Sequence, residues 1–279
     1  MSAPCMPSRQ VAASAATAPH FRVLEGNRLK GPPASEPGLT TFYTHTLCPY
    51  AERVWLTLLE KGAAFQLVQI DLSDKPRWYR TVNSSSLVPA IEYDGTFYTE
   101  SMDICRWIDN NLEGPALMPA NDNDRQQAES LLRSKDSVIS AGLSLASGSD
   151  SRSWGIGSRP TGAQRKGFES SLQVLAASLQ QHGGPFLLGK QLTLADLSLL
   201  PFMERFDLVM REFLGMRLET MHSGSIQTWL EGMQERPSCR TASADNSLLL
   251  EAYRTHHSLD FFDYQTYHAA SCHPQLAYQ

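Results

Sequence analysis

The sequence has no long apolar stretch and no long basic run. Its apolar segments, such as Leu197–Phe202, are far shorter than the roughly 20 residues that a membrane-spanning helix needs. The formal net charge is −5 at pH 7, without a cluster of basic residues that could follow a phosphate backbone. We therefore expect no membrane span and no nucleic-acid partner. The 279 residues, 42% of them hydrophobic, suffice for one or two globular domains.

Cysteine is scarce, and its spacing excludes two common roles. The five cysteines are Cys5, Cys48, Cys105, Cys239 and Cys272, with no Cys-x-x-Cys pair among them. An odd number of scattered cysteines is not a disulfide framework, so a reducing compartment such as the cytoplasm is expected. The histidines near Cys272 follow no standard zinc-ligand spacing, so we expect no metal site.

Residues 1–38 have no periodic apolar face and are predicted to be an N-terminal extension. They are rich in Ala, Ser and Pro, and no acidic residue precedes Glu25, whereas Arg9 and Arg22 are basic. Two interpretations stay open: a disordered tail on a cytoplasmic protein, or a transit peptide that directs the protein to a plastid.

Residues 39–113 alternate strand and helix patterns in the α/β order of a thioredoxin-like domain. Gly62 stands where a C-cap glycine ends a helix, and Asp94-Gly95 is a strong hairpin signal. The predicted strands are Thr40–His45, Phe65–Leu72, Leu87–Tyr93 and Thr96–Thr99, and the predicted helices are Pro49–Lys61 and Ser101–Leu112.

The second half of the chain has helical periodicity throughout. Residues 114–123 are predicted to be a linker, residues 124–257 an all-helical domain, and residues 258–279 an aromatic tail of undefined structure. Thr193 and Asp196 have the spacing of a capping box at a helix start. The predicted helices are Gln126–Leu145, Gln164–His182, Leu194–Phe206 and Ser225–Arg236, with a long loop, Ser147–Gly162, after the first.

The junction between the first predicted strand and helix carries the strongest chemical signal. Cys48 precedes Pro49, which suits the first helical position because its missing N–H would be unpaired there. The thiol would face free backbone N–H groups at the positive end of the helix dipole, and both lower a thiol pKa. A buried and inert cysteine is the alternative.

A lowered pKa would favour disulfide exchange over attack alone. A drop from about 8.5 to about 5 raises the thiolate fraction at pH 7 roughly 30-fold but costs roughly 40-fold in nucleophilicity. The benefit therefore comes when Cys48 is the leaving group of a mixed disulfide. Position 51 is Ala rather than a resolving cysteine, so the second thiol must come from outside, and glutathione is the obvious supplier.

Several motifs, in this order, resemble one family. They are Cys48–Arg53 (CPYAER), Asp74–Trp78 (DKPRW), Leu87–Ala90 (LVPA), Glu100-Ser101, Glu113–Pro119 (EGPALMP), Gly184–Gly189 (GPFLLG), Thr193–Asp196 (TLAD) and Pro201–Phe206 (PFMERF). Together they look like the lambda and omega classes of the cysteine-type glutathione transferases. The resemblance implies a thioredoxin-like domain followed by a helical bundle, a catalytic Cys48, and a monomer rather than a dimer.

The resemblance also implies how glutathione, the co-substrate, is bound. The implied binding residues are Pro49, Tyr50, Lys75, Val88, Pro89, Glu100 and Ser101. In the family, the residue at Val88 pairs its backbone with the cysteinyl unit, and Pro89 matches a cis-proline. Glu100 and Ser101 match the pair that holds the γ-glutamyl end at a helix start. Lys75 matches a lysine that meets the glycyl carboxylate.

An acceptor site is expected between the two domains, where pockets are common. By resemblance, Met203, Arg205, Phe206 and Tyr253 contribute to it, although the helical spacing of Met203 and Phe206 also fits core residues. The acceptor would be a small hydrophobic molecule or a disulfide.

The sequence thus predicts a glutathione-dependent thiol transferase that reduces mixed disulfides through a Cys48–glutathione intermediate. Deglutathionylation and dehydroascorbate reduction belong to the same resemblance. Two other functions stay open: glutathione conjugation with Tyr43 beside the thiolate, and non-catalytic transport of hydrophobic ligands.

Overall fold

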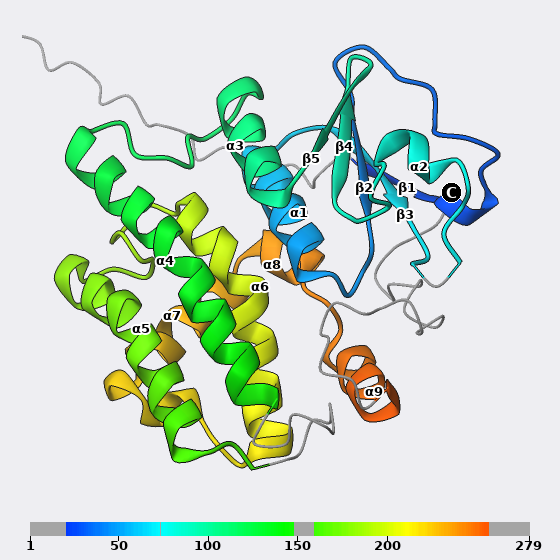
Figure 1. Cartoon of the computed structure of the whole chain (residues 1–279). Coiled ribbons are helices and arrows are strands. Elements are labelled where there is room, and N and C mark those ends of the chain that lie inside the picture. Colours follow the sequence, from blue (N-terminus) through cyan, green and yellow to red (C-terminus); the bar gives the residue numbers. More distant parts are fainter. Residues whose placement is uncertain (1–20, 73, 148–158, 257–279) are drawn as a thin grey trace, which may run out of the picture.

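The structure, a computed structural model, describes residues 21–72, 74–147 and 159–256 and places a five-stranded sheet beside a bundle of helices (Figure 1). The strand order is β1-β3-β2-β4-β5, in which β1 and β2 run parallel to β3 while β4 and β5 are antiparallel. The strands are β1 (Phe21–Glu25), β2 (Thr40–Thr44), β3 (Phe65–Gln69), β4 (Ala90–Tyr93) and β5 (Thr96–Thr99). The helices of this domain are η1 (Gly26–Arg28), α1 (Pro49–Lys61), α2 (Tyr79–Val82) and α3 (Ser101–Asn111). The predicted thioredoxin-like fold is confirmed.

Strand β1 corrects the prediction that residues 1–38 lie outside this domain. Phe21–Glu25 pairs in parallel with β3 along its whole length, so it completes the sheet edge. The ring of Phe21 stacks on Phe65 at 4.9 Å, and its edge meets Trp55 at 6.0 Å. Within this strand only Val23 is buried, and its neighbours are half-buried. Five residues with one buried side chain give too weak an apolar pattern to predict a strand beside an Ala/Ser/Pro-rich segment.

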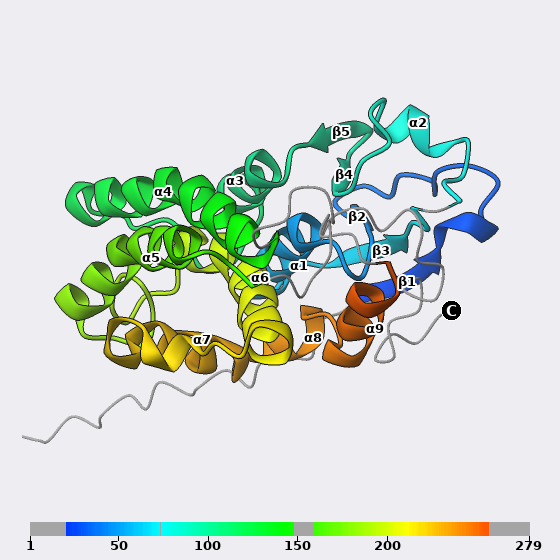
Figure 2. The ribbon, with the colours of Figure 1, turned by 60° about the horizontal axis from the view of Figure 1, so that its bottom comes forward.

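Helix α1 ends and begins as the sequence indicates. Pro49 occupies the first turn, and Gly62 ends the helix in the left-handed conformation with φ 65°. Both faces of α1 are buried, because the sheet covers one side and the helical domain the other (Figure 2). Its buried polar residues Glu52 and Arg53 therefore need partners from neighbouring elements.

The helical domain confirms the predicted all-α second half and extends it. Its elements are α4 (Asp122–Ser147), α5 (Gly162–His182), α6 (Leu194–Val209), a π-helical turn η2 (Met210–Leu214), η3 (Leu218–Thr220), η4 (His222–Gly224), α7 (Ser225–Gln234), α8 (Pro237–Ala242) and α9 (Asn246–His256). The capping box of Thr193 and Asp196 is present at the start of α6. Helices α8 (6 residues) and α9 (11 residues) were not predicted individually, although both lie within the predicted all-helical domain. The tail 258–279 and most of the loop Ser147–Gly162 lie outside the described residues.

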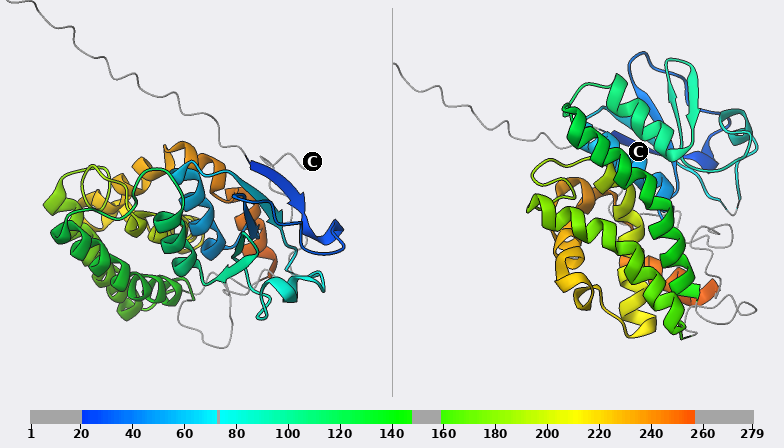
Figure 3. Two further views of the ribbon diagram at one scale, coloured as in Figure 1. Left: turned by 90° about the horizontal axis from the view of Figure 1, so that it is seen from above. Right: turned by 60° about the vertical axis from the view of Figure 1, so that its left-hand side comes forward.

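The two domains share a buried boundary along α1, and Figure 3 shows the sheet and the bundle on opposite sides of it. At the far end of α1, Lys61 binds Asp109 of α3 at 3.3 Å. The linker crosses here at Gly114, where a Cβ would lie 2.1 Å from the Lys61 carbonyl oxygen. Among the described residues, no helix is long and apolar enough to cross a bilayer.

Candidate active site

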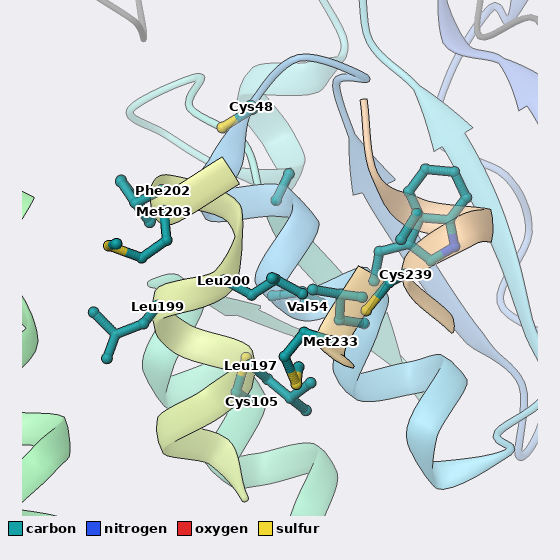
Figure 4. Close-up of a cluster of buried hydrophobic side chains, with 14 of the residues drawn as sticks. Cys48, Val54, Cys105, Leu197, Leu199, Leu200, Phe202, Met203, Met233 and Cys239 are labelled. Carbon is teal, nitrogen blue, oxygen red and sulfur yellow. The ribbon is translucent and has the colours of Figure 1, made fainter. Parts of the chain in front are cut away.

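Cys48 is the N-cap residue of α1, at the point where the chain leaves β2. Its side chain is 5% exposed, and its Sγ donates to the Val88 carbonyl oxygen at 3.8 Å. The backbone N–H groups of Tyr50 and Ala51 point at the sulfur and favour its ionised form. Figure 4 shows Cys48 at the start of α1, apart from Cys105 and Cys239. No second cysteine of the described residues is therefore placed to resolve a disulfide on Cys48.

The pKa of Cys48 corrects the expectation drawn from its position. Burial raises the pKa of the thiol to about 11, which outweighs the lowering by the Ala51 and Tyr50 N–H groups and by the charge of Arg205. The N–H groups at the start of α1 lower the pKa of the thiol, as predicted. The desolvation of the thiolate raises this pKa by more than they lower it. The resting thiol is therefore protonated at neutral pH.

The loop that faces Cys48 is held by hydrogen bonds to its backbone. The Val88–Pro89 peptide bond is cis, as the resemblance implied. The Leu87 carbonyl oxygen accepts from the Tyr79 hydroxyl at 2.8 Å and from Asn83 Nδ2 at 2.9 Å. Asn83 Oδ1 in turn accepts from both the backbone and the hydroxyl of Ser85. Tyr79 and Asn83 are thus supporting residues that the sequence analysis missed.

Glu100 and Ser101, the predicted binding residues for the γ-glutamyl end of glutathione, lie at the start of α3, where the helix has no side-chain cap. Glu100 is the exposed N-cap, with φ 66° and no side-chain cap. Ser101 is buried, and its hydroxyl oxygen accepts from Arg53 at 3.5 Å. Since uncapped N–H groups attract carboxylates, the arrangement can receive an anionic ligand group.

Lys75 and Tyr50, two further predicted glutathione-binding residues, lie in different surroundings. Lys75 is in the β3–α2 connection and lines a cavity of about 600 Å³ together with Arg77, Arg80 and Ser84–Ser86. Tyr50 is half-buried and packs edge-on against Phe202 at 5.1 Å. The structure thus brings the Val88 backbone to the Cys48 sulfur, and no contact joins Lys75 to that sulfur among the interactions of the described residues.

The predicted acceptor residues have no open face in the structure. Met203 and Phe206 are buried in the core, and the Phe206 ring packs edge-on against Phe168 at 5.8 Å. Tyr253 is likewise buried, and Arg205 borders a cavity of about 280 Å³ beside α8 and α9. In this structure Met203 and Phe206 thus have the surroundings of core residues, the alternative that their helical spacing left open, and their contribution to an acceptor site stays a prediction.

Arg205 instead supports the start of α1 from the helical domain. It donates to Glu52 Oε2 at 2.8 Å and to the Leu47 carbonyl oxygen at 2.9 Å. It also donates to the Pro201 carbonyl oxygen one turn earlier in its own helix. The ion pair with Glu52 ties α6 to α1, and the hydrogen bond to Leu47 ties α6 to the residue that precedes Cys48.

Tyr43 is placed as a packing residue of β2. Its side chain is 1% exposed, and its ring lies 5.7 Å from Tyr79 and 6.2 Å from Trp78. Burial, with the charge of Glu92, raises the pKa of its hydroxyl. This environment gives the conjugation alternative no support.

Comparison with known proteins agrees with the fold. Residues 47–111 match the family model of the glutathione S-transferase N-terminal domain, and residues 124–241 match that of the C-terminal domain. Glutathione S-transferase L3 of Arabidopsis thaliana is 30% identical over 227 residues, covering 80% of this chain and 90% of the relative. Glutathione S-transferase L2, chloroplastic, of the same plant is 32% identical over 247 residues, covering 85% and 80%. Glutathione transferase Omega 3C from Trametes versicolor shares the fold, with a TM-score of 0.66 at 23% identity over 76% of this chain and 91% of that one.

Proposed function

The chain belongs to the glutathione S-transferase family, and we propose that it is a glutathione-dependent thiol transferase acting through a mixed disulfide on Cys48. The observation that carries the proposal is the Cys48 thiol at the start of α1, directed at the Val88 carbonyl oxygen. A second support is the absence of another described cysteine next to it, which leaves the resolving step to an external thiol.

The reaction consists of two thiol–disulfide exchanges. The Cys48 thiolate attacks the glutathione sulfur of a mixed disulfide, so a Cys48–glutathione disulfide forms and the acceptor leaves as a thiolate that takes up a proton. A second glutathione thiolate then attacks the glutathione sulfur on Cys48, which releases glutathione disulfide and the Cys48 thiolate. In sum, one mixed disulfide and one glutathione become the acceptor thiol and glutathione disulfide, so the acceptor sulfur is reduced at the expense of the sulfur of the incoming glutathione.

Glutathione itself would help to ionise Cys48. In the free protein the thiol proton is directed at the Val88 carbonyl oxygen, a contact that favours the protonated form. When the cysteinyl unit of glutathione pairs with the Val88 backbone, that contact is lost. The Tyr50 and Ala51 N–H groups and the charge of Arg205 favour the thiolate, and they act against the burial that raises its pKa.

The remaining binding residues follow the family pattern. We assign the γ-glutamyl end to Glu100 and Ser101, and the glycyl carboxylate to Lys75 at the outer loop. No metal takes part in this scheme, and the described residues hold no cluster of side chains suited to one. Glutathionylated proteins, small mixed disulfides and dehydroascorbate are the proposed acceptors.

Reduction of a hydroxyethyl–glutathione mixed disulfide, in the intact protein and in Cys48→Ala, tests the proposal. We expect a loss of at least about a hundredfold in kcat, because the nucleophile is removed. Conjugation to a chlorodinitrobenzene is measured beside it, with Cys105→Ala as the control for cysteine loss. Reduction that survives in Cys48→Ala contradicts the proposal. Conjugation that survives there would favour a conjugating enzyme, and turnover in neither assay would favour a ligand carrier.

Location and assembly belong to the same proposal. A cytoplasmic protein or a plastid protein both fit, and one relative carries the name chloroplastic. Because β1 is part of the sheet, a removable targeting segment would have to end before Phe21. A fluorescent fusion with and without residues 1–20 tests this, and light scattering tests the proposed monomer.

A further inference from the structure

The cavity beside Lys75 carries more positive charge than the proposed glutathione site uses. It is lined by Lys75, Pro76, Arg77 and Arg80 and by the consecutive serines Ser84–Ser86, with no carboxylate among them. None of the three cationic side chains forms an ion pair or a hydrogen bond within the described part of the chain. In a chain of formal net charge −5, three unpaired cations around one cavity create a local field that attracts anions.

The cavity is also larger than one carboxylate needs. Its volume is about 600 Å³. At roughly 30 Å³ for each water-sized group, a carboxylate of three heavy atoms fills about 100 Å³. Pockets that hold a whole small molecule span about 300–1,000 Å³. If the glycyl carboxylate of glutathione lies at Lys75, most of the volume and two arginines therefore remain for a longer ligand.

The wall of the cavity is continuous with the loop that faces Cys48. Ser86 stands two residues before Val88, whose carbonyl oxygen lies 3.8 Å from the Cys48 sulfur. Two residues of chain span at most about 7 Å, so the cavity begins close to the Val88 backbone. Asn83 shapes this wall, because its Oδ1 accepts from the backbone and the hydroxyl of Ser85 and its carbonyl oxygen accepts from the Ser86 N–H. A peptide whose cysteinyl unit pairs with Val88 would thus direct its next residue toward the cavity.

The cavity can be reached from outside the helical domain. Lys75 and Arg77 lie in the connection between β3 and α2, and Arg80 lies on α2. These segments are on the side of the sheet away from α4 and α5 (Figures 1 and 2). Arg77 and Arg80 are both exposed. A ligand that extends past Lys75 therefore meets the two arginines without displacing any packed side chain.

We propose that this cavity extends the glutathione site and accepts γ-glutamyl-cysteinyl peptides longer than glutathione, such as γ-Glu-Cys-γ-Glu-Cys-Gly. The inference rests on the proposed glutathione site, with Lys75 at the glycyl carboxylate. In the longer peptide, the residue after the first cysteine is γ-linked, so its α-carboxylate branches from the chain where glutathione has its glycyl carboxylate. Lys75 receives this branch. The chain continues into the cavity, where Arg77 and Arg80 bind its terminal carboxylate.

The same geometry disfavours other anionic ligands. A peptide that continues through an ordinary α-linkage uses the corresponding carboxylate to form its next amide bond, so Lys75 loses its partner. A small inorganic anion would occupy only part of the volume and contact only some of the cations. The three serine hydroxyls can donate to the carbonyl groups of a peptide and accept from its N–H groups. The arrangement therefore fits a branched, γ-linked peptide better than either alternative.

The test compares three peptides by calorimetry on Cys48→Ala protein, where no thiol exchange on the protein interferes. They are glutathione, γ-Glu-Cys-γ-Glu-Cys-Gly, and its isomer with an α-linked central glutamate, which has the same mass and charge. Reduced peptides, metal-free buffer and low salt are used. We expect the γ-linked peptide to bind at least about fivefold more tightly than glutathione, the effect of two exposed charge pairs. The isomer should stay within about twofold of glutathione, and added salt should reduce the gain.

Variants of the cavity identify the source of the gain. Arg77→Gln/Arg80→Gln should abolish it and leave the affinity for glutathione within about threefold, and the exposure of both side chains should preserve the fold. Lys75→Gln should weaken glutathione and the longer peptide alike, because both place a carboxylate there. Arg165→Gln/Lys166→Gln is the matched control, since it removes two exposed charges from α5 in the helical domain and should leave the gain unchanged.

The outcomes separate this inference from the proposed function. Glutathione binding without a gain for the longer peptide, an equal gain for the α-linked isomer, or a gain that survives in Arg77→Gln/Arg80→Gln would overturn the inference alone. A gain that these arginines carry, in a protein whose intact form fails to reduce mixed disulfides, would uphold the inference and overturn the thiol-transferase function. No binding of any peptide would overturn both.

Discussion

The pKa of about 11 for Cys48 leads to a prediction that runs against the usual view of such a thiol. At pH 7 about one molecule in 10⁴ is ionised, against about 3% for an ordinary thiol of pKa about 8.5, a deficit of roughly 300-fold. A Brønsted slope of about 0.45 over 2.5 units returns roughly 13-fold in nucleophilicity. The free protein should therefore react with iodoacetamide at Cys48 at least about 20-fold more slowly than an exposed thiol does.

The assay is alkylation at Cys48, followed by peptide mass spectrometry between pH 6 and pH 10. The reference is an unstructured peptide with the sequence of Thr46–Arg53, which has the same covalent neighbours but neither the burial nor the helix. The rate in the protein should rise with pH across the whole range, without a plateau. A plateau with a midpoint below about 8.5 would refute the conclusion that burial outweighs the helix N-terminus at this sulfur.

Three further predictions concern stability. Glu52→Gln should cost about 3–5 kcal/mol in urea unfolding, because it leaves Arg205 as a buried charge without its counter-charge, and a cost below about 1 kcal/mol would contradict this. Burial lowers the pKa of His45 to about 4, so the folded state binds fewer protons than the unfolded state between pH 6.5 and pH 4. Stability should therefore fall by about 3 kcal/mol as the pH drops through this window, and His45→Gln should lose this dependence. Gly142→Ala should lower the free energy of unfolding by about 1–3 kcal/mol, since its Cβ would lie 2.3 Å from a buried phenylalanine ring. Gly167→Ala on α5 is the control, because its Cβ meets nothing within 4 Å and the change should be neutral or stabilising. Equal shifts in Tm for the two variants would refute the packing argument.

The sequence predicted correctly those features that depend on residues close together in the chain. The helix Pro49–Lys61 was predicted at its observed bounds, because a proline begins it and a glycine in the left-handed conformation ends it. The capping box at the start of α6 and the hairpin at Asp94-Gly95 are local in the same sense. The family motifs then placed Cys48 and the cis Val88–Pro89 bond correctly.

The errors arose where a property depends on residues far apart in the chain. Strand β1 is stabilised by β3, more than 40 residues later, and five residues carry too little pattern to reveal it. The burial of Met203 and Phe206 could not be predicted either, because it depends on α4 packing against α6 and on the contact of Phe168 with Phe206. The pKa of Cys48 was misjudged in direction, since a helix N-terminus can be read from sequence while desolvation cannot. Arg53 stands in a recognised motif, yet only the structure shows that its charge has no carboxylate partner.

The protonation state of Cys48 in the free protein bears on how glutathione would act in the proposed reaction. Burial keeps the thiol protonated at neutral pH, whereas disulfide exchange needs the thiolate. In the proposed reaction, bound glutathione would have to lower the pKa of this thiol. Because linkage is reciprocal, a ligand that lowers the Cys48 pKa must bind more tightly as the pH rises, tenfold for each unit by which it lowers that pKa. The raised pKa of the free thiol is then compatible with catalysis, since it restricts the reactive thiolate to the state in which glutathione is already bound.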